Sequence, residues 1–217
     1  MTELANQPGL HKQLLPPGGR RYAISIPESY DGDRPAPLVI ALHWGGPVAP
    51  FTGKWLLAGL VEPALRELGA LLVAPDRTLE DWANPQSEAE TLELLDFVIK
   101  NYSIDAQRIL LTGYSLGGIG TWYMAARNQD LFTAALPISA IPLPETVEID
   151  WRIPLHVIHS RQDEIFPLEP VEEVVHTLKA NGVAIDLVII DGITHFETER
   201  FASSLLAAVP WIRDVWS

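Results

Sequence analysis

The chain has 217 residues, 47% hydrophobic and 20% charged, which is typical of a globular protein and excludes general disorder. This length predicts a single domain, which we place at residues 1–217 with an N-terminal extension over residues 1–20. The 28 acidic and 15 basic residues give a net charge of −13, and an acidic surface disfavours binding to nucleic acid or anionic membranes. The absence of cysteine excludes a disulfide framework, a thiolate nucleophile and cysteine-bound zinc.

The first residues lack the apolar core of a signal peptide. The sequence also lacks the apolar run of roughly 18 residues that a membrane-spanning helix needs. We therefore expect a cytoplasmic protein without a membrane segment. The sequence leaves its oligomeric state open.

Short apolar runs alternate along the chain with longer segments of helical pattern. The runs predict strands at residues 22–27, 38–42, 70–74, 109–112, 134–138, 155–159 and 185–190. The intervening segments predict helices at residues 55–68, 87–101, 116–128, 171–180 and 196–215, the last of them kinked or split at Pro210. Most runs are rich in Val, Ile and Leu without strict alternation, which is typical of parallel strands buried on both faces. The order predicts an α/β fold with a doubly wound, mostly parallel sheet, whose ligand site lies at the carboxyl ends of the strands.

A G-x-S-x-G pentapeptide, residues 113–117, follows the predicted strand at 109–112 and precedes a predicted helix. A nucleophile elbow requires this strand–turn–helix context. Glycine recurs in the first turn of the helix, where it is unfavourable, and this indicates close approach of the helix to the sheet. The alternative is a glycine-rich turn with an incidental serine. We take Ser115 as the candidate nucleophile.

A serine hydroxyl needs a base, and in elbow-type sites the acid and the histidine follow the serine along the chain. Downstream of Ser115, only His195 lies in a loop after the last predicted strand. His156 and His159 are three positions apart in one strand and therefore lie on opposite faces, which also excludes them as a metal pair. His176 belongs to an amphipathic helix. His195 is the candidate base, and the alternative is an ordinary loop histidine.

The acid is expected one strand earlier, in the loop after residues 155–159. Asp163 and Glu164 both qualify by position. Asp163 is favoured because its shorter side chain holds an imidazole with fewer free torsions. The alternative for either residue is a solvated loop acid, the usual environment of such side chains.

The loop after the strand at 38–42 reads His-Trp-Gly-Gly-Pro at residues 43–47. It is expected to supply one backbone N–H of an oxyanion hole, and the N–H of Leu116 would be the other. Gly45 and Gly46 allow the backbone to approach a reacting carbon closely. We expect His43 to hydrogen-bond the backbone and shape this hole rather than act as a base.

Together, residues 42–46, 113–118, 162–167 and 192–195 resemble motifs of the α/β-hydrolase superfamily, over about residues 22–217. Within it they are similar to small serine esterases of the carboxylesterase/phospholipase and dienelactone-hydrolase-like group. The resemblance implies carboxylic ester hydrolysis through an acyl-enzyme, without a metal or organic cofactor. Ser115 departs from the cysteine of dienelactone hydrolases, and Trp44 replaces the glycine usual in the oxyanion loop. Either Trp44 or Gly45 could therefore complete the hole, and we favour Gly45.

The expected activity is cleavage of small, soluble carboxylic esters, with a small-molecule ester as the partner. An acyl-thioesterase or a peptidase would use the same triad, and a non-catalytic binding module would share the fold. The strongly acidic chain disfavours anionic acyl-CoA. The stretch 139–153 holds two prolines and is too short for a helical lid, so we expect a minimal fold without a cap domain. Trp44 is either a wall of the substrate pocket or simple loop packing.

Overall fold

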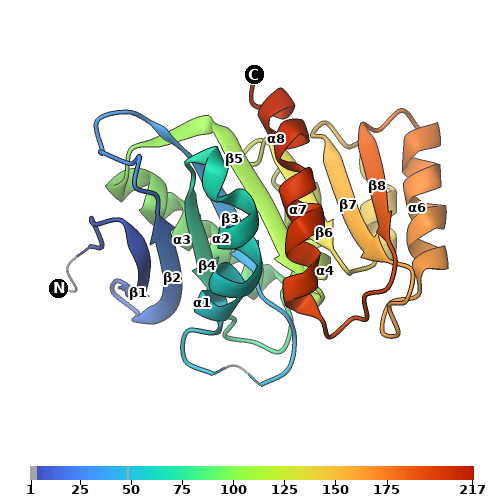
Figure 1. Ribbon diagram of the computed structural model, residues 1–217, viewed down its shortest axis with the longest axis horizontal. Helices are drawn as coiled ribbons and strands as arrows, with labels where there is room; N and C mark the ends of the chain where they lie inside the picture. Colours follow the sequence, from blue (N-terminus) through green and yellow to red (C-terminus); the bar gives the residue numbers. More distant parts are fainter. Residues whose placement is uncertain (1–3, 48) are drawn as a thin grey trace.

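The structure, a computed structural model, describes residues 4–47 and 49–217. These residues build an eight-stranded sheet of order β1-β2-β4-β3-β5-β6-β7-β8 (Figure 1). The strands are β1 (Gly9–Leu15), β2 (Arg20–Ile26), β3 (Ala36–Leu42), β4 (Leu71–Pro75), β5 (Ile104–Tyr114), β6 (Ala134–Ile138), β7 (Leu155–Ser160) and β8 (Ile185–Ile190). The pairs β1–β2 and β2–β4 are antiparallel, and the pairs from β4 to β8 are parallel. The predicted doubly wound, mostly parallel sheet is confirmed.

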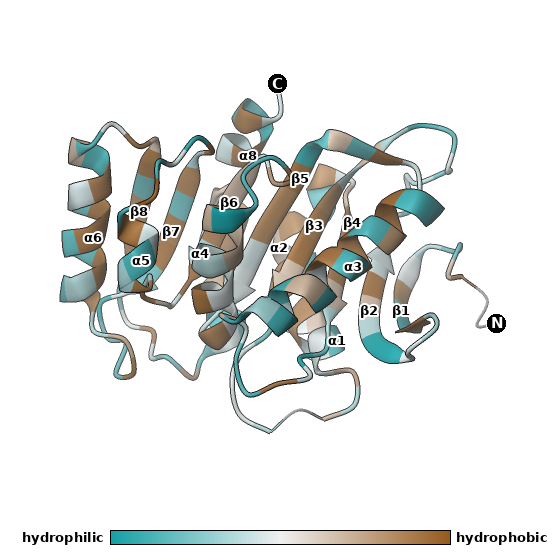
Figure 2. Ribbon diagram, turned by 180° about the vertical axis from the view of Figure 1, so that it is seen from behind, coloured by the Kyte–Doolittle hydropathy of each residue, from teal (hydrophilic) through white to brown (hydrophobic). Residues whose placement is uncertain are grey.

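Helices cover both faces of the sheet (Figures 1 and 2). One face carries α3 (Pro85–Asn101), α4 (Leu116–Arg127) and α6 (Leu168–Ala180). The other carries α1 (Thr52–Leu56), η1 (Leu57–Val61), α2 (Glu62–Leu65), α7 (Ala202–Ala207) and α8 (Val209–Val215). Three short elements complete the order: η2 (Arg66–Leu68), α5 (Pro144–Val147) and η3 (Thr198–Phe201). Between β6 and β7 the helical structure is the single turn of α5, so this connection carries no helical lid.

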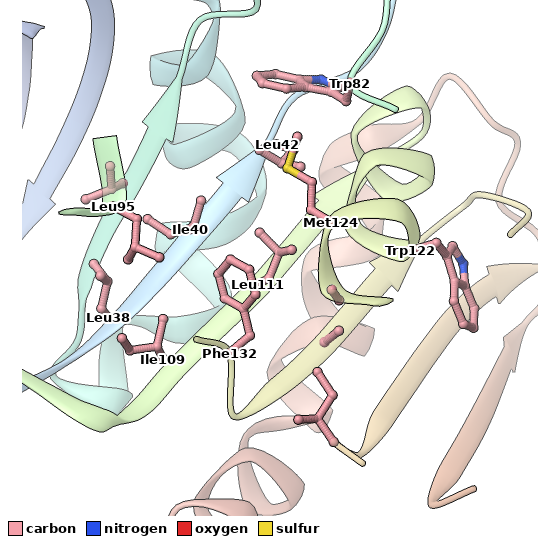
Figure 3. Close-up of a cluster of buried hydrophobic side chains, with 14 of the residues drawn as sticks. Leu38, Ile40, Leu42, Trp82, Leu95, Ile109, Leu111, Trp122, Met124 and Phe132 are labelled. Carbon is pink, nitrogen blue, oxygen red and sulfur yellow. The ribbon is translucent and has the colours of Figure 1, made fainter. Parts of the chain in front are cut away.

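The central strands bury side chains on both faces. Leu38, Ile40 and Leu42 of β3 pack with α3 and α4 (Figure 3), whereas Val39 and Ala41 pack with the helices on the opposite face. All seven residues of β3 are buried. Burial on both faces removes the need for polar residues at alternate positions, which explains the continuous apolar runs in the sequence.

Residues 9–15 form strand β1 at the edge of the sheet, where the sequence analysis expected an extension. This strand pairs with β2 in a register from Gly9 opposite Ile26 to Leu15 opposite Arg20. Within β1, Leu15 is buried and the other side chains are exposed or half-buried. Backbone hydrogen bonds rather than buried apolar side chains hold this edge, so its sequence lacks the apolar run of a central strand.

Two predicted helices are interrupted where a proline removes a backbone donor. The helix expected at 55–68 begins at Thr52 and changes from α1 through η1 to α2, with Pro63 in the first turn of α2. The helix expected at 196–215 divides into η3, α7 and α8, with Pro210 in the first turn of α8, which confirms the predicted split. Within the described part of the chain, a search for helices that could cross a membrane finds none.

Candidate active site

Ser115 occupies a sharp turn between β5 and α4. Its φ of 58° and ψ of −122° lie in a region that L-residues rarely adopt. A Cβ on Gly113 would lie 2.2 Å from the carbonyl oxygen of Gly117, and a Cβ on Gly117 would lie 1.9 Å from the carbonyl oxygen of Leu42. The turn therefore requires glycine on both sides of Ser115, as the pentapeptide predicts.

Ser115, His195 and Asp163 come together at the carboxyl ends of β5, β8 and β7. Oγ of Ser115 lies 2.8 Å from Nε2 of His195. On the other side of the ring, Nδ1 of His195 lies 3.0 Å from Oδ1 and 2.9 Å from Oδ2 of Asp163. Because a carboxylate only accepts hydrogen bonds, Nδ1 carries the proton and Nε2 is free to accept one from Ser115. The three side chains are buried, with residue exposures of 9%, 5% and 6% respectively.

Asp163 is held in its ionised form by several donors. Burial alone raises the pKa of Asp163, but hydrogen bonds from His195, the backbone N–H of Phe166 and the hydroxyl of Ser139 outweigh it and lower this pKa to about 2. Ser139 directly follows β6, is fully buried and has a φ of 52°. Its hydroxyl donates to Oδ2 of Asp163 and lies 3.2 Å from Nδ1 of His195. The sequence analysis did not identify Ser139.

The backbone of His195 is also fixed. Its N–H donates to Oε2 of Glu164 at 2.8 Å, and its carbonyl oxygen accepts a hydrogen bond from the hydroxyl of Tyr114. Glu164 thus contacts the backbone of the candidate base, whereas Asp163 contacts its ring. This arrangement supports Asp163 over Glu164 as the acid.

His156 and His159, which were also considered in the sequence, take no part in the hydrogen bonds that join Ser115, His195 and Asp163. His156 packs against Trp211 on the α8 side of the sheet, with the ring centroids 4.9 Å apart. His159 has Nε2 2.8 Å from the carbonyl oxygen of Phe166 and 3.8 Å from Oδ2 of Asp163. Burial lowers the pKa of both histidines, which keeps them neutral.

The loop after β3 lies beside the turn at Ser115. His43 is fully buried, with Nδ1 2.8 Å from the carbonyl oxygen of Trp44 and Nε2 accepting the backbone N–H of Arg77 at 3.1 Å. The expectation that His43 bonds the backbone is confirmed. Leu116 begins α4, where backbone N–H groups have no partner inside the helix. A Cβ on Gly45 would lie 3.4 Å from Cδ2 of Leu116, so this loop contacts the start of α4.

Two adjoining clefts open beside Ser115. The inner cleft measures about 500 Å³ and is lined by Trp44, Gly45, Gly46, Tyr114, Ser115, Ile165, His195, Phe196 and Thr198. The outer cleft, about 560 Å³, shares Trp44, Phe196 and Thr198 with the inner one and continues to Trp55. Phe196 and Trp55 are 73% and 62% exposed, unusually high values for large aromatic side chains. The two clefts form one open groove that runs from Ser115 to Trp55, which we call the aromatic groove.

A mostly parallel sheet with helices on both faces, and a buried Ser–His–Asp arrangement at its carboxyl edge, define an α/β-hydrolase with the geometry of a serine hydrolase. The profile of the dienelactone hydrolase family matches residues 78–205, which is more than half of the chain. The chain belongs to the dienelactone hydrolase family.

The chain is also similar to curated relatives in sequence and to solved structures in fold. The chain is 27% identical to a probable feruloyl esterase C of Aspergillus terreus over 75% of its own length, and the match spans 62% of that relative. It is also 27% identical to the feruloyl esterase C of Emericella nidulans, over 82% of this chain and 70% of that protein. Among solved structures, a ferulic acid esterase superposes with a TM-score of 0.79 at 20% identity, over 96% of this chain and 98% of its own. A fluorophosphonate-binding serine hydrolase of Staphylococcus aureus superposes with a TM-score of 0.75 at 15% identity, over 94% and 98% of the two chains.

Proposed function

We propose that this protein hydrolyses small carboxylic esters through an acyl-enzyme formed on Ser115. The observation that carries this proposal is the 2.8 Å contact between Oγ of Ser115 and Nε2 of His195, with Asp163 on the other ring nitrogen. These side chains follow three different strands, β5, β7 and β8, and their hydrogen bonds join them in the order that nucleophilic attack requires. Membership of the dienelactone hydrolase family supports the same reaction class.

In the proposed mechanism, Oγ of Ser115 attacks the ester carbonyl carbon while Nε2 of His195 takes the hydroxyl proton. Asp163 stabilises the imidazolium that forms and keeps the ring oriented. The tetrahedral intermediate collapses, the bond to the alcohol oxygen breaks, and His195 gives its proton to that oxygen. Water, deprotonated by His195, then attacks the acyl carbon. As this second tetrahedral intermediate collapses, the bond to Oγ of Ser115 breaks, His195 returns the proton to Oγ, and the carboxylic acid leaves.

The aromatic groove indicates which class of ester the protein would bind. Trp55 and Phe196 present exposed ring surfaces beside a cleft that leads directly to Ser115, and Trp44 lies between the two clefts. Planar groups pack well against such surfaces. Two of the relatives are named feruloyl esterase C, one of them as probable, and the feruloyl group is a planar aromatic acyl group. We therefore propose esters with a planar aromatic group as substrates, bound in an open groove from the solvent.

The groove disfavours strongly anionic substrates. Glu197 and Glu199 line its outer cleft beside Arg200, and the whole chain carries a net charge of −13. A coenzyme A thioester would bring several phosphate charges against these carboxylates. This charge distribution favours ester over acyl-CoA hydrolysis and is consistent with a small, neutral substrate in the cytoplasm.

Three substrates with the same acetyl group test the proposal: p-nitrophenyl acetate, the neutral thioester S-acetyl-N-acetylcysteamine, followed by thiol detection with a disulfide reagent, and p-nitroacetanilide. We expect a burst of p-nitrophenol equal to the enzyme concentration, followed by slower steady turnover, and kcat/KM at least about 100-fold lower for the anilide. Preferred cleavage of the thioester or the anilide would assign the same triad to a thioesterase or a peptidase. The absence of turnover and burst on all three would indicate a binding module.

A further inference from the structure

The acid and the base of the site lie on two loops that hydrogen bonds join together. These loops follow β7 and β8, which are neighbours in the sheet (Figure 1). The hydroxyl of Ser160, at the end of β7, donates to the carbonyl oxygen of Ile193. Glu164, also in the loop after β7, accepts the backbone N–H of His195 at 2.8 Å. The two loops are therefore held together as one unit.

We call residues 160–166 and 191–197 together the acid–base unit. Ser115 lies outside this unit, in the turn between β5 and α4. Attack by Ser115 requires Oγ to stay within hydrogen-bond reach of Nε2 of His195, and the two atoms are 2.8 Å apart. A misplacement of about 1 Å between reacting groups can cost roughly 100-fold in rate. A contact that fixes the nucleophile turn against the acid–base unit would therefore matter for catalysis.

Tyr114 makes such a contact. It is the last residue of β5, directly precedes Ser115 and is 2% exposed. Its hydroxyl donates to the carbonyl oxygen of His195. Its ring centroid lies 5.7 Å from that of His195 and 5.3 Å from that of Phe201, which packs against it at 71°. The buried ring and its hydroxyl thus tie the backbone of the base to the residue beside the nucleophile.

The two hydrogen bonds to the backbone of His195 have different consequences. The bond from its N–H to Glu164 lies inside the acid–base unit, so Glu164 would move together with the base. The bond from Tyr114 to its carbonyl oxygen crosses from the nucleophile turn to the unit. Only the second of these two bonds can set the distance between the base and the nucleophile.

We propose that Tyr114 is a positioning residue, whose hydroxyl holds His195 at the distance from Ser115 that proton transfer requires. This inference rests on the proposed function, because the distance has a role only if Ser115 is the nucleophile. It goes further by assigning a task to a side chain that takes no part in the proton transfers themselves.

The hydroxyl of Tyr114 is a neutral donor. Burial raises the pKa of Tyr114 to about 12, against the opposing effects of hydrogen bonds with Thr198 and Ser139. The nearby charges of Asp163 and Glu164 also raise this pKa. Histidine ordinarily titrates near pH 6.5, so Tyr114 keeps its proton throughout the range in which a histidine base gains or loses one. Loss of the hydroxyl should therefore lower the rate by the same factor at each pH.

The proposed mechanism also predicts which kinetic steps are affected. His195 transfers a proton in both acylation and deacylation, so a displaced base slows both steps. The ring of Tyr114 lines the inner cleft, and a phenylalanine would keep that surface. Removal of the hydroxyl alone should therefore lower kcat and leave KM nearly unchanged.

Tyr114→Phe tests the proposal, and Tyr102→Phe is its matched control. The hydroxyl of Tyr102 donates to the carbonyl oxygen of Ala5 at 2.9 Å, and Tyr102 is 8% exposed. Burial raises the pKa of Tyr102 to about 12 as well. Each variant thus removes one buried hydroxyl that is bonded to a backbone carbonyl, but Tyr102 makes its bond outside the site. Tyr102→Phe therefore controls for a general loss of stability.

We expect Tyr114→Phe to lower kcat on p-nitrophenyl acetate by about 20-fold, with KM within about two-fold of wild type. The rates of the burst and of steady turnover should fall by similar factors at every pH from about 6 to 9. Tyr102→Phe should keep kcat within about two-fold of wild type. An unchanged kcat in a folded Tyr114→Phe protein, or an equal loss in Tyr102→Phe, would overturn the proposal. A loss confined to alkaline pH would also overturn it, because Tyr114 would then act as a proton donor.

Two further side chains at position 114 keep the proposal testable if Tyr114→Phe does not fold. 4-Aminophenylalanine retains a donor in the place of the hydroxyl, whereas 4-fluorophenylalanine fills the same space without one. We expect the amino side chain to keep kcat within about three-fold of wild type and the fluoro side chain to lower it by about 20-fold. Equal activity of these two proteins would refute the role of the hydrogen bond. Failure of the proposed function is a separate result: a Ser115→Ala protein that retains turnover rejects the mechanism whatever the changes at position 114 do.

Discussion

Oε2 of Glu164 lies 2.8 Å from the backbone nitrogen of His195, while the adjacent Asp163 binds the ring of the same histidine through Nδ1. Glu164 thus fixes the backbone of His195, and the neighbouring Asp163 fixes its ring. The division predicts different outcomes for two isosteric variants.

Asp163→Asn should lower kcat by roughly 10³-fold or more, because an amide can present N–H to Nδ1 and favour the wrong tautomer of His195. Glu164→Gln should stay within about ten-fold of wild type, since its amide oxygen can still accept the backbone N–H. Steady-state kinetics on p-nitrophenyl acetate checks both variants, with circular dichroism as the control for folding. A crippled Glu164→Gln beside a mild Asp163→Asn would reverse the assignment of the acid.

Ser115, His195 and Asp163, which the structure brings together, could be singled out from the sequence because each follows an apolar run and lies in a recognisable loop. Ser139 has no such signal. It stands between Ile138 and Ala140 with no motif, and its importance arises from a φ of 52° that turns its hydroxyl onto Asp163. Backbone conformation of this kind depends on tertiary packing, which local residue patterns do not encode.

Two further features of the structure, the contacts of His43 and strand β1, could not be predicted from the sequence for a related reason. Arg77 and Trp82 hydrogen-bond His43, in the loop after β3, from positions more than thirty residues further along the chain, and no spacing rule connects them. Strand β1 was missed because an edge strand needs backbone pairing more than apolar side chains. The central strands were predicted because burial on both faces leaves a strong compositional signal.

Ser139→Ala should reduce kcat about ten-fold with little change in KM. The variant lacks the hydroxyl that donates to Oδ2 of Asp163. This hydrogen bond holds the carboxylate against His195 and lowers the pKa of Asp163. Kinetics at fixed pH tests the effect on kcat, and thermal unfolding of the same variant controls for a general loss of stability. An unchanged kcat in a folded variant would remove Ser139 from the site.

His43 should make the protein less stable as the pH falls from 6.5 towards 4. Burial lowers its pKa from 6.5 to about 4 in the folded state, so the unfolded chain binds the proton first and is favoured in this window. Once the pH is below 4, the lost free energy of unfolding is on the order of 3 to 4 kcal/mol, because the pKa of His43 is lowered from 6.5 to about 4. Urea unfolding at pH 7, 5 and 4 should show a shallower pH dependence for His43→Asn than for wild type. Parallel curves would refute this contribution.

Among aliphatic acyl groups, the open groove predicts a preference for short chains over long ones. The connection between β6 and β7 holds only the single turn of α5 among its described helices, which cannot cover a long chain. Each added methylene then gains little of the roughly 0.8 kcal/mol available on full burial. Rates on p-nitrophenyl alkanoates should peak at acetate or butyrate and decline towards laurate. A preference for laurate, or a jump in rate at the solubility limit, would indicate a lid or an apolar tunnel.

Trp55 should contribute to selectivity for aromatic acyl groups. Its ring is 62% exposed at the far end of the aromatic groove, so Trp55→Ala should leave folding intact and lower the ratio of kcat/KM for methyl ferulate to that for methyl butyrate by about five-fold. Trp55→Phe, which keeps a ring at this position, should retain most of the ratio. An identical ratio in all three proteins would exclude the outer cleft from substrate binding.

The most direct test of the central claim is covalent labelling with a fluorophosphonate, followed by intact-mass and peptide mapping. Wild type should gain one adduct, located on Ser115, and lose esterase activity in proportion to its labelling. Ser115→Ala should remain unlabelled and lose at least about 10³-fold in kcat, whereas Ser203→Ala, at an exposed serine on α7, should label like wild type. A Ser115→Ala protein that is still labelled, or that hydrolyses esters within ten-fold of wild type, would contradict Ser115 as the nucleophile.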